Sequence, residues 1–125
     1  MSAFKYSDEV LRRFRNPENA GTIEHPSGVG SVGNRTCGDV MELFIKVVDN
    51  IIVDAKFKTL GCAAAISFSD VLCDVVKGKT VDEALKITKD DLVKILGGVP
   101  TPKLHCSLLA VDALHKAVED YFKRK

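Results

Sequence analysis

Two segments in which apolar and polar side chains alternate follow each other in the first half of the chain. The first runs from Val40 to Val48 and the second from Ile51 to Lys58, with only Asp49 and Asn50 between them. Asp and Asn tolerate the left-handed backbone conformations that a two-residue hairpin turn requires. Alternation with a period of two places apolar side chains on one face of a strand. This stretch therefore predicts an antiparallel β-hairpin that needs a covering layer on one face.

Two helical patterns later in the chain supply that layer. Apolar residues recur at helical spacing over residues 63–77, and Gly78 ends the pattern. A second pattern over residues 104–122 predicts a long amphipathic C-terminal helix. With strands early and helices late, the sequence predicts an α+β fold, in which a small antiparallel sheet of about three strands packs against several helices.

Shorter elements complete the chain, which at 125 residues fits a single domain spanning 1–125. They are a helix after Ser7, a helix beginning with a capping box from Thr80 to Glu83, a helix over 90–96, and a short strand near 29–32 inside the loop 19–38.

The charge balance argues against partners that are recognised by charge alone. The chain has 18 basic and 17 acidic residues, and its only basic run is Lys123-Arg124-Lys125. A protein that neutralises phosphates would show a basic excess or face, so nucleic acid is not expected as a partner. The first ten residues lack the apolar core of a secretory signal, and no apolar stretch is long enough to span a bilayer. We therefore expect a cytoplasmic protein with no membrane partner.

Three of the four cysteines fall where predicted elements begin or end. Cys37 precedes the first hairpin strand, Cys62 follows the second where a helix begins, and Cys106 lies in the first turn of the last helix. Because a helix N-terminus favours the thiolate, lowered pKa values are expected at Cys62 and Cys106. Any one of these cysteines could instead be a small buried apolar residue. Their shared placement at element boundaries favours a common site.

Potential ligands of other types accompany these cysteines. Asp39 follows Cys37 by two residues, and His105 directly precedes Cys106. Three thiolates with a carboxylate or an imidazole as fourth ligand suit either Zn²⁺ or an iron-sulfur cluster. Lys103 stands close enough along the chain to stabilise anionic sulfur.

The fourth cysteine, Cys73, does not fit this site. It lies eleven residues into the helix that Cys62 begins, about 16 Å further along at 1.5 Å per residue. It shares a helical face with Ile66, so we expect it in the core.

A thiol enzyme is a less favoured interpretation than a non-catalytic binding protein. Adjacent side chains on a helix diverge by about 100°, so His105 and Cys106 are expected to be alternative ligands rather than a base and its nucleophile. A structural zinc protein remains the main alternative.

Several segments of the sequence resemble the IscU scaffold family, equivalently the N-terminal domain of NifU. They are Asn16-Pro-Glu-Asn-Ala-Gly21, Cys37-Gly-Asp-Val-Met41, Lys56-Phe-Lys-Thr-Leu-Gly-Cys62-Ala-Ala-Ala-Ile66, Lys77-Gly-Lys-Thr-Val-Asp-Glu-Ala-Leu85 and Lys103-Leu-His-Cys-Ser-Leu-Leu-Ala110. They occur in the family's order and cover nearly the whole chain.

The resemblance implies a function and a set of site residues. A scaffold of this family, which is not an enzyme, receives persulfide sulfur from a cysteine desulfurase of the IscS or NifS kind, together with iron and electrons. It assembles a labile [2Fe-2S] cluster and transfers it to recipient apo-proteins. The implied ligands are Cys37, Cys62 and Cys106, with Asp39 or His105 in the fourth position. Cys106 would be the main sulfur acceptor, Asp39 would keep the cluster labile, and Zn²⁺ can occupy the cluster-free form.

Two departures from the family pattern limit what the resemblance implies. Many members carry Leu-Pro-Pro-Val-Lys, which a dedicated Hsp70-type chaperone recognises, where this chain has Val99-Pro-Thr-Pro-Lys103. This difference places chaperone delivery in doubt. Ala63 stands where a glycine commonly follows the second cysteine. The zinc-bound SufU branch is less similar, because this chain lacks its insertion and retains His105. The residues leave open whether the chain forms a homo-oligomer.

A glycine-rich motif, G-x-G-x-x-G, is formed by Gly28, Gly30 and Gly33. In a dinucleotide-binding fold such a motif follows a strand and opens a helix, but here a strand is expected after it. We therefore do not expect a nucleotide site.

Overall fold

The predicted hairpin forms the centre of the sheet. The computed structural model describes residues 6–34 and 38–125, apart from the side chain of residue 34. Strands β2 (Asp39–Val48) and β3 (Ile51–Leu60) pair antiparallel, and Val48 lies opposite Ile51. Asp49 and Asn50 connect them with φ angles of 52° and 65°. Both angles are positive, as a type I′ turn requires, so the hairpin prediction is confirmed.

A third strand, β1 (Gly28–Asn34), lies on the other side of β2. It also pairs antiparallel, and the strand order is β1-β2-β3. The strand is longer than the segment 29–32 expected from the sequence. The structure confirms the predicted α+β class with its small antiparallel sheet.

The helices begin and end close to where their sequence signals stand. Ser7 caps α1 and accepts from the backbone N–H of Val10, and the capping box of Thr80 and Glu83 opens α3. The helices are α1 (Asp8–Arg15), α2 (Ala63–Val76), α3 (Val81–Ala84), α4 (Lys89–Ile95), the 3₁₀ turn η1 (Thr101–Lys103) and α5 (His105–Arg124). Within the described ranges, no helix combines the length and the apolar character that crossing a bilayer would require.

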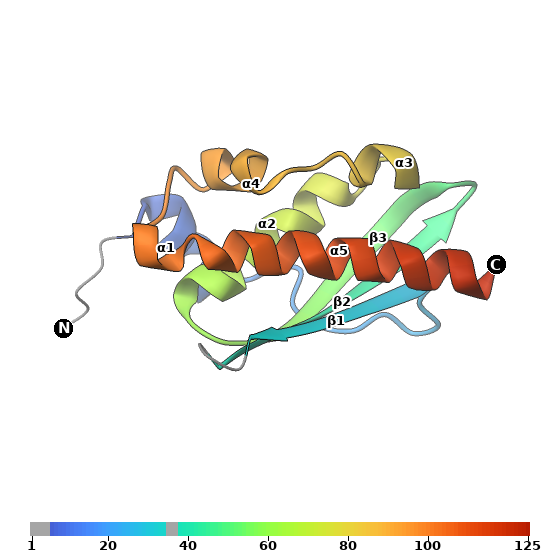
Figure 1. Ribbon diagram of the computed structural model, residues 1–125, viewed down its shortest axis with the longest axis horizontal. Helices are drawn as coiled ribbons and strands as arrows, with labels where there is room; N and C mark the ends of the chain where they lie inside the picture. The colour runs from blue at the N-terminus through green and yellow to red at the C-terminus, as the bar shows by residue number, and fades with distance from the viewer. Residues whose placement is uncertain (1–5, 35–37) are drawn as a thin grey trace.

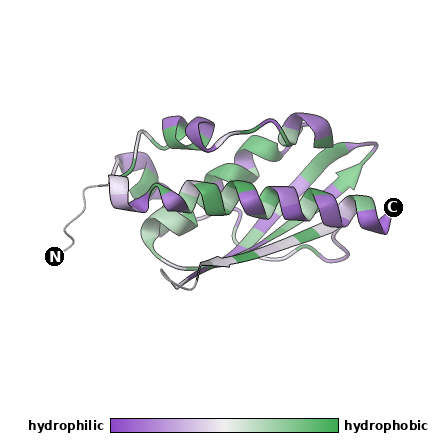
Figure 2. Ribbon diagram, viewed as in Figure 1, coloured by the Kyte–Doolittle hydropathy of each residue, from purple (hydrophilic) through white to green (hydrophobic). Residues whose placement is uncertain are grey.

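The helices cover one face of the sheet (Figure 1). Helix α5 packs against β1 and β2, whereas α2 packs against β3. Met41, Leu43 and Ile45 alternate along β2 and are buried beneath these helices together with Phe68 of α2. Figure 2 shows α2 as largely hydrophobic, while hydrophobic and hydrophilic residues alternate along α5. This agrees with α2 lying inside the molecule and α5 at its surface.

A buried polar network attaches the N-terminal segment to α2. The Arg13 guanidinium donates to Asp70 at 2.8 Å and to Asp74 at 2.6 Å. Asn19 donates through its backbone N–H and its side-chain amide to Asp70, both at 3.0 Å. Because burial of an unpaired charge is costly, these partners stabilise Asp70 in its 2% exposed position. The network holds α1 and the following loop against α2.

The glycine-rich motif has a packing role in β1. Side chains added at Gly28 and Gly30 would overlap the carbonyl oxygens of Ala117 and Ala113 in α5. The two glycines are two residues apart and so face the same side of the strand. Their lack of side chains lets the backbone of α5 approach β1 closely, and small alanines on the helix serve the same approach. Two of the three motif glycines therefore serve the packing of α5.

Replacing Gly30 with alanine should destabilise the protein. The new methyl group would overlap Ala113 O and lie 2.5 Å from Ala117 N, both rigid backbone atoms. Overpacking of this kind costs about 1–3 kcal/mol, so the midpoint of urea unfolding should fall. Gly33→Ala is the matched control, because its added Cβ would come no closer than 3.7 Å to the atoms around it. Equal stabilities for the two variants would refute this account of the motif.

Candidate metal centre

The ends of two neighbouring strands bring the first two ligand candidates together. Asp39 begins β2, and Val40 beside it pairs with Leu60 at the end of β3. Two residues after Leu60, Cys62 occupies the N-cap position of α2. The hairpin register thus places Asp39 and Cys62 at the same end of the sheet, although 23 positions separate them in the sequence.

The start of α5 brings Cys106 to the same place. Its Sγ lies 4.0 Å from the Sγ of Cys62 and 3.6 Å from Oδ2 of Asp39. One potential ligand atom from each of Asp39, Cys62 and Cys106 lies within 4.8 Å of the other two. Asp39 and Cys106 are buried, and Cys62 is partly exposed. The three side chains form a ligand group at the edge of the core.

His105 lies beside this ligand group. Its Nδ1 is 3.0 Å from the backbone carbonyl of Pro102, which can only accept, so Nδ1 carries the proton in this hydrogen bond. The other ring nitrogen, Nε2, lies 3.6 Å from Cys106 Sγ and 3.6 Å from Asp39 Oδ2. An imidazole oriented through its other nitrogen in this way can ligate a metal. The expected divergence of His105 and Cys106 is wrong, because the imidazole reaches back toward the sulfur.

Three distances around Cys106 Sγ are close to those of a tetrahedral metal site. In a zinc site with Zn–S bonds of about 2.3 Å and Zn–O or Zn–N bonds of about 2.1 Å, two sulfur ligands lie about 3.8 Å apart. A sulfur ligand and an oxygen or nitrogen ligand lie about 3.6 Å apart in the same geometry. The distances around Cys106 Sγ, 4.0 Å to sulfur and 3.6 Å to Asp39 and His105, match these values closely. Small adjustments would let the group hold a thiophilic metal.

The two described site thiols differ in acidity. The thiol of Cys106 hydrogen-bonds Cys62 and lowers the pKa of Cys62 to about 5, with help from the Ala65 backbone N–H and the charge of Lys103. The Cys62 thiolate in turn raises the pKa of Cys106, and burial and Asp39 act in the same direction. The lowered pKa expected at Cys106 from its helix position is therefore wrong. Burial beside two anionic groups outweighs the helix N-terminus there.

Lys103 and Tyr6 also lie within electrostatic reach of the sulfur atoms. The charge of Cys62 raises the pKa of Lys103, which agrees with the expectation that this lysine faces anionic sulfur. Burial raises the pKa of Tyr6, and the charges of Cys62 and Cys106 add to that effect. Sequence reasoning missed Tyr6, because it precedes α1 and nothing near it in the chain indicates metal chemistry.

The other candidate residues lie elsewhere or outside the described residues. Cys37 is outside them. Cys73 is completely buried in the core, as expected, and burial raises its pKa. His25 and His115 are exposed side chains that do not join the ligand group.

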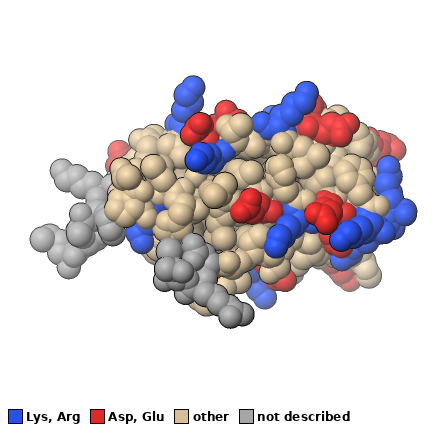
Figure 3. Space-filling model, in the orientation of Figure 1, with Lys and Arg blue, Asp and Glu red and all other residues tan. Residues whose placement is uncertain are grey.

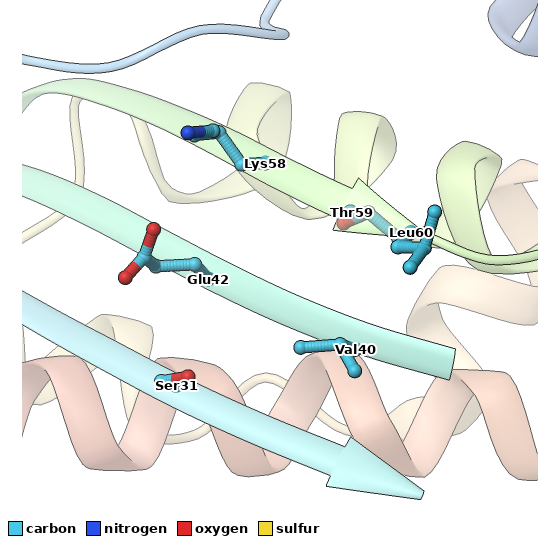
Figure 4. Close-up of a pocket in the computed structure, with 6 residues that line it drawn as sticks. All are labelled: Ser31, Val40, Glu42, Lys58, Thr59 and Leu60. Atoms are coloured by element: carbon cyan, nitrogen blue, oxygen red, sulfur yellow. The ribbon is translucent and has the colours of Figure 1, made fainter. Parts of the chain in front are cut away.

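A pocket on the open face of the sheet offers no comparable chemistry (Figure 4). It is lined by Ser31, Val40, Glu42, Lys58, Thr59 and Leu60, and the helices lie behind the sheet in this view. Glu42 and Lys58 are cross-strand partners, so their opposite charges are suited to pair with each other. The pocket lies on the surface near the ligand group, but the ligand group does not line it.

Comparison with known proteins identifies the family of this chain. Residues 5–125 match the family described as the NifU-like N terminal domain. The chain belongs to this family. It is 56% identical over 119 residues to iron-sulfur cluster assembly scaffold protein IscU 1 of Archaeoglobus fulgidus, covering 95% of this chain and 78% of that protein. It is 43% identical to the IscU scaffold protein of Aquifex aeolicus, covering 98% and 80% of the two chains.

A solved structure of a NifU-like relative shares the fold. The crystal structure of a putative iron-sulfur cluster assembly scaffold protein for the SUF system, from Fervidobacterium islandicum, superimposes with a TM-score of 0.75. The two chains are 28% identical, and the match covers 90% of this chain and 96% of that one. The two proteins therefore share one fold.

The difference in thiol acidity predicts how the metal-free protein reacts with iodoacetamide. Cys62 should be labelled much faster than Cys106 near neutral pH, because it is thiolate and more exposed. Its rate should fall as the pH drops through about 5, the pKa of Cys62. Cys106→Ala removes the donating thiol, so this midpoint should rise toward the ordinary cysteine range. Mass spectrometry of the labelled peptides measures both rates.

Cys73→Ala is the control for that experiment, because it removes a buried cysteine outside the ligand group. It should leave the Cys62 profile unchanged. A Cys62 midpoint that stays in place in Cys106→Ala would show that Cys106 does not set the acidity of Cys62.

Proposed function

We propose that this chain is a scaffold on which an iron-sulfur cluster is assembled and then passed to other proteins. The convergence of Asp39, Cys62 and Cys106 at one edge of the core carries the proposal. The 56% identity to an archaeal scaffold protein supports it. We further propose a [2Fe-2S] cluster on Cys37, Cys62 and Cys106, with Asp39 or His105 as the fourth ligand. In this role the chain is not an enzyme, because the assembled cluster leaves it as cargo.

Sulfur would arrive as the persulfide of a cysteine desulfurase. A scaffold thiolate attacks the outer sulfur of that persulfide, a new S–S bond forms on the scaffold, and the desulfurase cysteine leaves as a thiolate. Two electrons from a reduced electron-transfer protein then release the sulfur as sulfide and restore the scaffold thiolate. Ferrous iron binds the sulfide and the ligand side chains. Lys103, whose charge interacts with Cys62, would stabilise the anionic sulfur in these steps.

Cys106 is the proposed final acceptor of this sulfur, and access to it is a physical requirement. Its side chain is 1% exposed, whereas Cys62 is partly exposed and already favours the thiolate. Delivery to Cys106 therefore needs either movement of the turn before α2 or passage of sulfur through Cys62. The 4.0 Å between the two sulfur atoms is short enough for a direct transfer.

Asp39 is proposed to keep the cluster exchangeable. A carboxylate is a harder ligand than a thiolate and so a poorer partner for iron bound to sulfide. Because Asp39 lies within 3.6 Å of Cys106 Sγ, it can occupy a ligand position without a large movement. A cluster held partly by this carboxylate would leave more readily than one held by four thiolates.

Exposed apolar side chains beside the ligand group support docking of partner proteins. Val40 and Leu60 are 45% and 73% exposed, and Leu104 and Leu108 are 40% and 51% exposed. In Figure 3 the charged residues gather over the C-terminal half of α5, and the end where α5 begins is largely uncharged. Exposed large apolar side chains near a site are typical of protein interaction surfaces. We propose as partners the cysteine desulfurase, the iron and electron donors and the recipient apo-proteins. We do not propose an Hsp70-type chaperone as a partner, because residues 99–103 depart from the motif that such a chaperone recognises in the family.

Zinc binding is the second candidate function. The spacing around Cys106 favours it, since Asp39, Cys62 and Cys106 already form a ligand group and His105 lies 3.6 Å from Cys106 Sγ as a further ligand candidate. Zinc in a scaffold would occupy the cluster-free form and exchange when iron and sulfur arrive. Zinc in a structural zinc protein would not exchange.

Anaerobic reconstitution tests the scaffold proposal. The protein is incubated with ferrous iron, cysteine and a cysteine desulfurase, and visible absorption then follows cluster formation and its transfer to an apo-ferredoxin. Wild type should develop charge-transfer bands that move to the acceptor. Cys106→Ser should form little cluster. Asp39→Ala should form a cluster that transfers more slowly, because His105 would then complete the ligand set in place of the harder carboxylate.

Cys73→Ala again provides the control, because it changes a cysteine without touching the ligand group. It should assemble and transfer a cluster like wild type. If wild type forms no cluster while one zinc per chain resists exchange, the scaffold proposal is wrong and the structural zinc protein replaces it.

A further inference from the structure

The backbone of Gly61 lies directly against the carboxylate of Asp39. A Cβ atom added at Gly61 would overlap Oδ1 of Asp39, lie 3.0 Å from its Cγ and lie 3.1 Å from the Cβ of Ala65. The first two contacts involve a side chain of the ligand group. The space that a side chain at position 61 would need is therefore occupied by the Asp39 carboxylate.

The strand register explains this closeness. Val40 of β2 pairs with Leu60 of β3 in antiparallel register. Continuing the register by one residue puts Asp39 opposite position 61. Cross-strand partners project their side chains toward the same face of a sheet. Any side chain at position 61 would thus enter the face on which Asp39 meets Cys106.

Backbone conformation does not require glycine at this position. Gly38 and Gly97 adopt positive φ angles of 74° and 76°, but Gly61 does not belong to that group. An alanine could adopt the backbone conformation of Gly61. The requirement for glycine is therefore steric, and it comes from one functional side chain.

Asp39 has little freedom to avoid a methyl group at position 61. The residue is 3% exposed, and Cys106 and His105 lie on its other side at 3.6 Å. Ala65, itself 2% exposed, closes the space beside position 61. The carboxylate must either rotate away from Cys106 or carry the end of β2 with it.

We propose that Gly61 is a positioning residue that holds the Asp39 carboxylate in the ligand group by leaving space for it. The inference rests on the proposed function in one respect, the role of Asp39 in keeping the cluster exchangeable. Gly61→Ala should behave as a milder form of Asp39→Ala, although every ligand side chain is still present.

Zinc affinity of the cluster-free protein gives a readout that does not depend on cluster assembly. Competition with a chromophoric chelator compares wild type, Gly61→Ala, Asp39→Ala, the double variant and Gly33→Ala. We expect Gly61→Ala to weaken Zn²⁺ binding about tenfold, the low end for loss of a group that orients a metal ligand. The double variant should bind no more weakly than Asp39→Ala, because both changes act through one carboxylate. Gly33→Ala, whose added Cβ meets only ordinary contacts, should bind like wild type.

Cluster transfer provides the second readout. Clusters on Gly61→Ala should pass to apo-ferredoxin more slowly than those on wild type, as on Asp39→Ala, and the double variant should be no slower than Asp39→Ala. Thermal unfolding of each variant separates this effect from a general loss of stability. A lowered melting temperature together with faster spontaneous decay of the cluster would count against the positioning role. That combination would indicate a damaged fold, which loses its cluster without a recipient protein.

The outcomes separate failure of this inference from failure of the proposed function. The inference is overturned if Gly61→Ala binds Zn²⁺ as tightly as wild type while Asp39→Ala binds it more weakly. It is also overturned if the losses of Zn²⁺ affinity in the two single variants add up in the double variant. If Asp39→Ala itself changes neither zinc affinity nor transfer, the role proposed for Asp39 fails. A crystal structure of Gly61→Ala then decides the inference alone: a displaced Asp39 carboxylate supports it, and an unmoved one overturns it.

Discussion

The antiparallel register between β2 and β3 is the constraint on which the site depends. It brings Asp39 against Gly61 and ends β3 two residues before Cys62, the N-cap of α2, so two ligand candidates reach one end of the sheet. A slip by one residue would turn Asp39 to the open face of the sheet. The side chains buried under α2 and α5 prevent that slip, since it would expose the apolar face of β2. The core that stabilises the fold therefore also fixes the geometry of the ligand group.

The third ligand candidate depends on a separate constraint, the close approach of α5 to β1. Gly28 and Gly30 allow the helix backbone to lie nearly on the strand. The first turn of the same helix carries Cys106 to within 4.0 Å of Cys62. Two long-range packing arrangements thus meet at one point, and the site exists only where both are satisfied. This placement at a junction of elements, with apolar side chains exposed around it, suits a site whose cargo must enter and leave.

Sequence reasoning succeeded where the signal was local. The Asp49-Asn50 turn, the capping box at Thr80 and the end of α2 near Gly78 each depend on a few neighbouring residues, and the structure has all three. It failed where the outcome depends on what else packs nearby. The helix position of Cys106 indicated an acidic thiol, but burial beside Asp39 and Cys62 reverses the direction. Adjacent residues on a helix are separated by about 100° in the direction of their Cβ atoms. The imidazole of His105 extends far enough beyond its Cβ to turn back toward the sulfur of Cys106. Gly61 gave no signal beyond preceding Cys62, because its neighbour across the sheet is known only once the register is known.

The metal-free site satisfies its own polar groups, and this bears on how a scaffold can release its cargo without unfolding. The single proton of the Cys106 thiol lies between two acceptors, Asp39 Oδ2 at 3.6 Å and Cys62 Sγ at 4.0 Å, and the Pro102 carbonyl accepts from His105. These contacts reduce the cost of leaving a buried carboxylate without a metal. Binding a metal at Cys106 must remove the thiol proton, so loading competes with this internal hydrogen bond and releases the proton. In the proposed scaffold, the same few atoms would thus exchange a proton for a metal ion. For the proposed scaffold, this internal hydrogen bonding would lower the cost of releasing the cluster, whereas the metal of a structural zinc site supplies folding energy and has no such substitute.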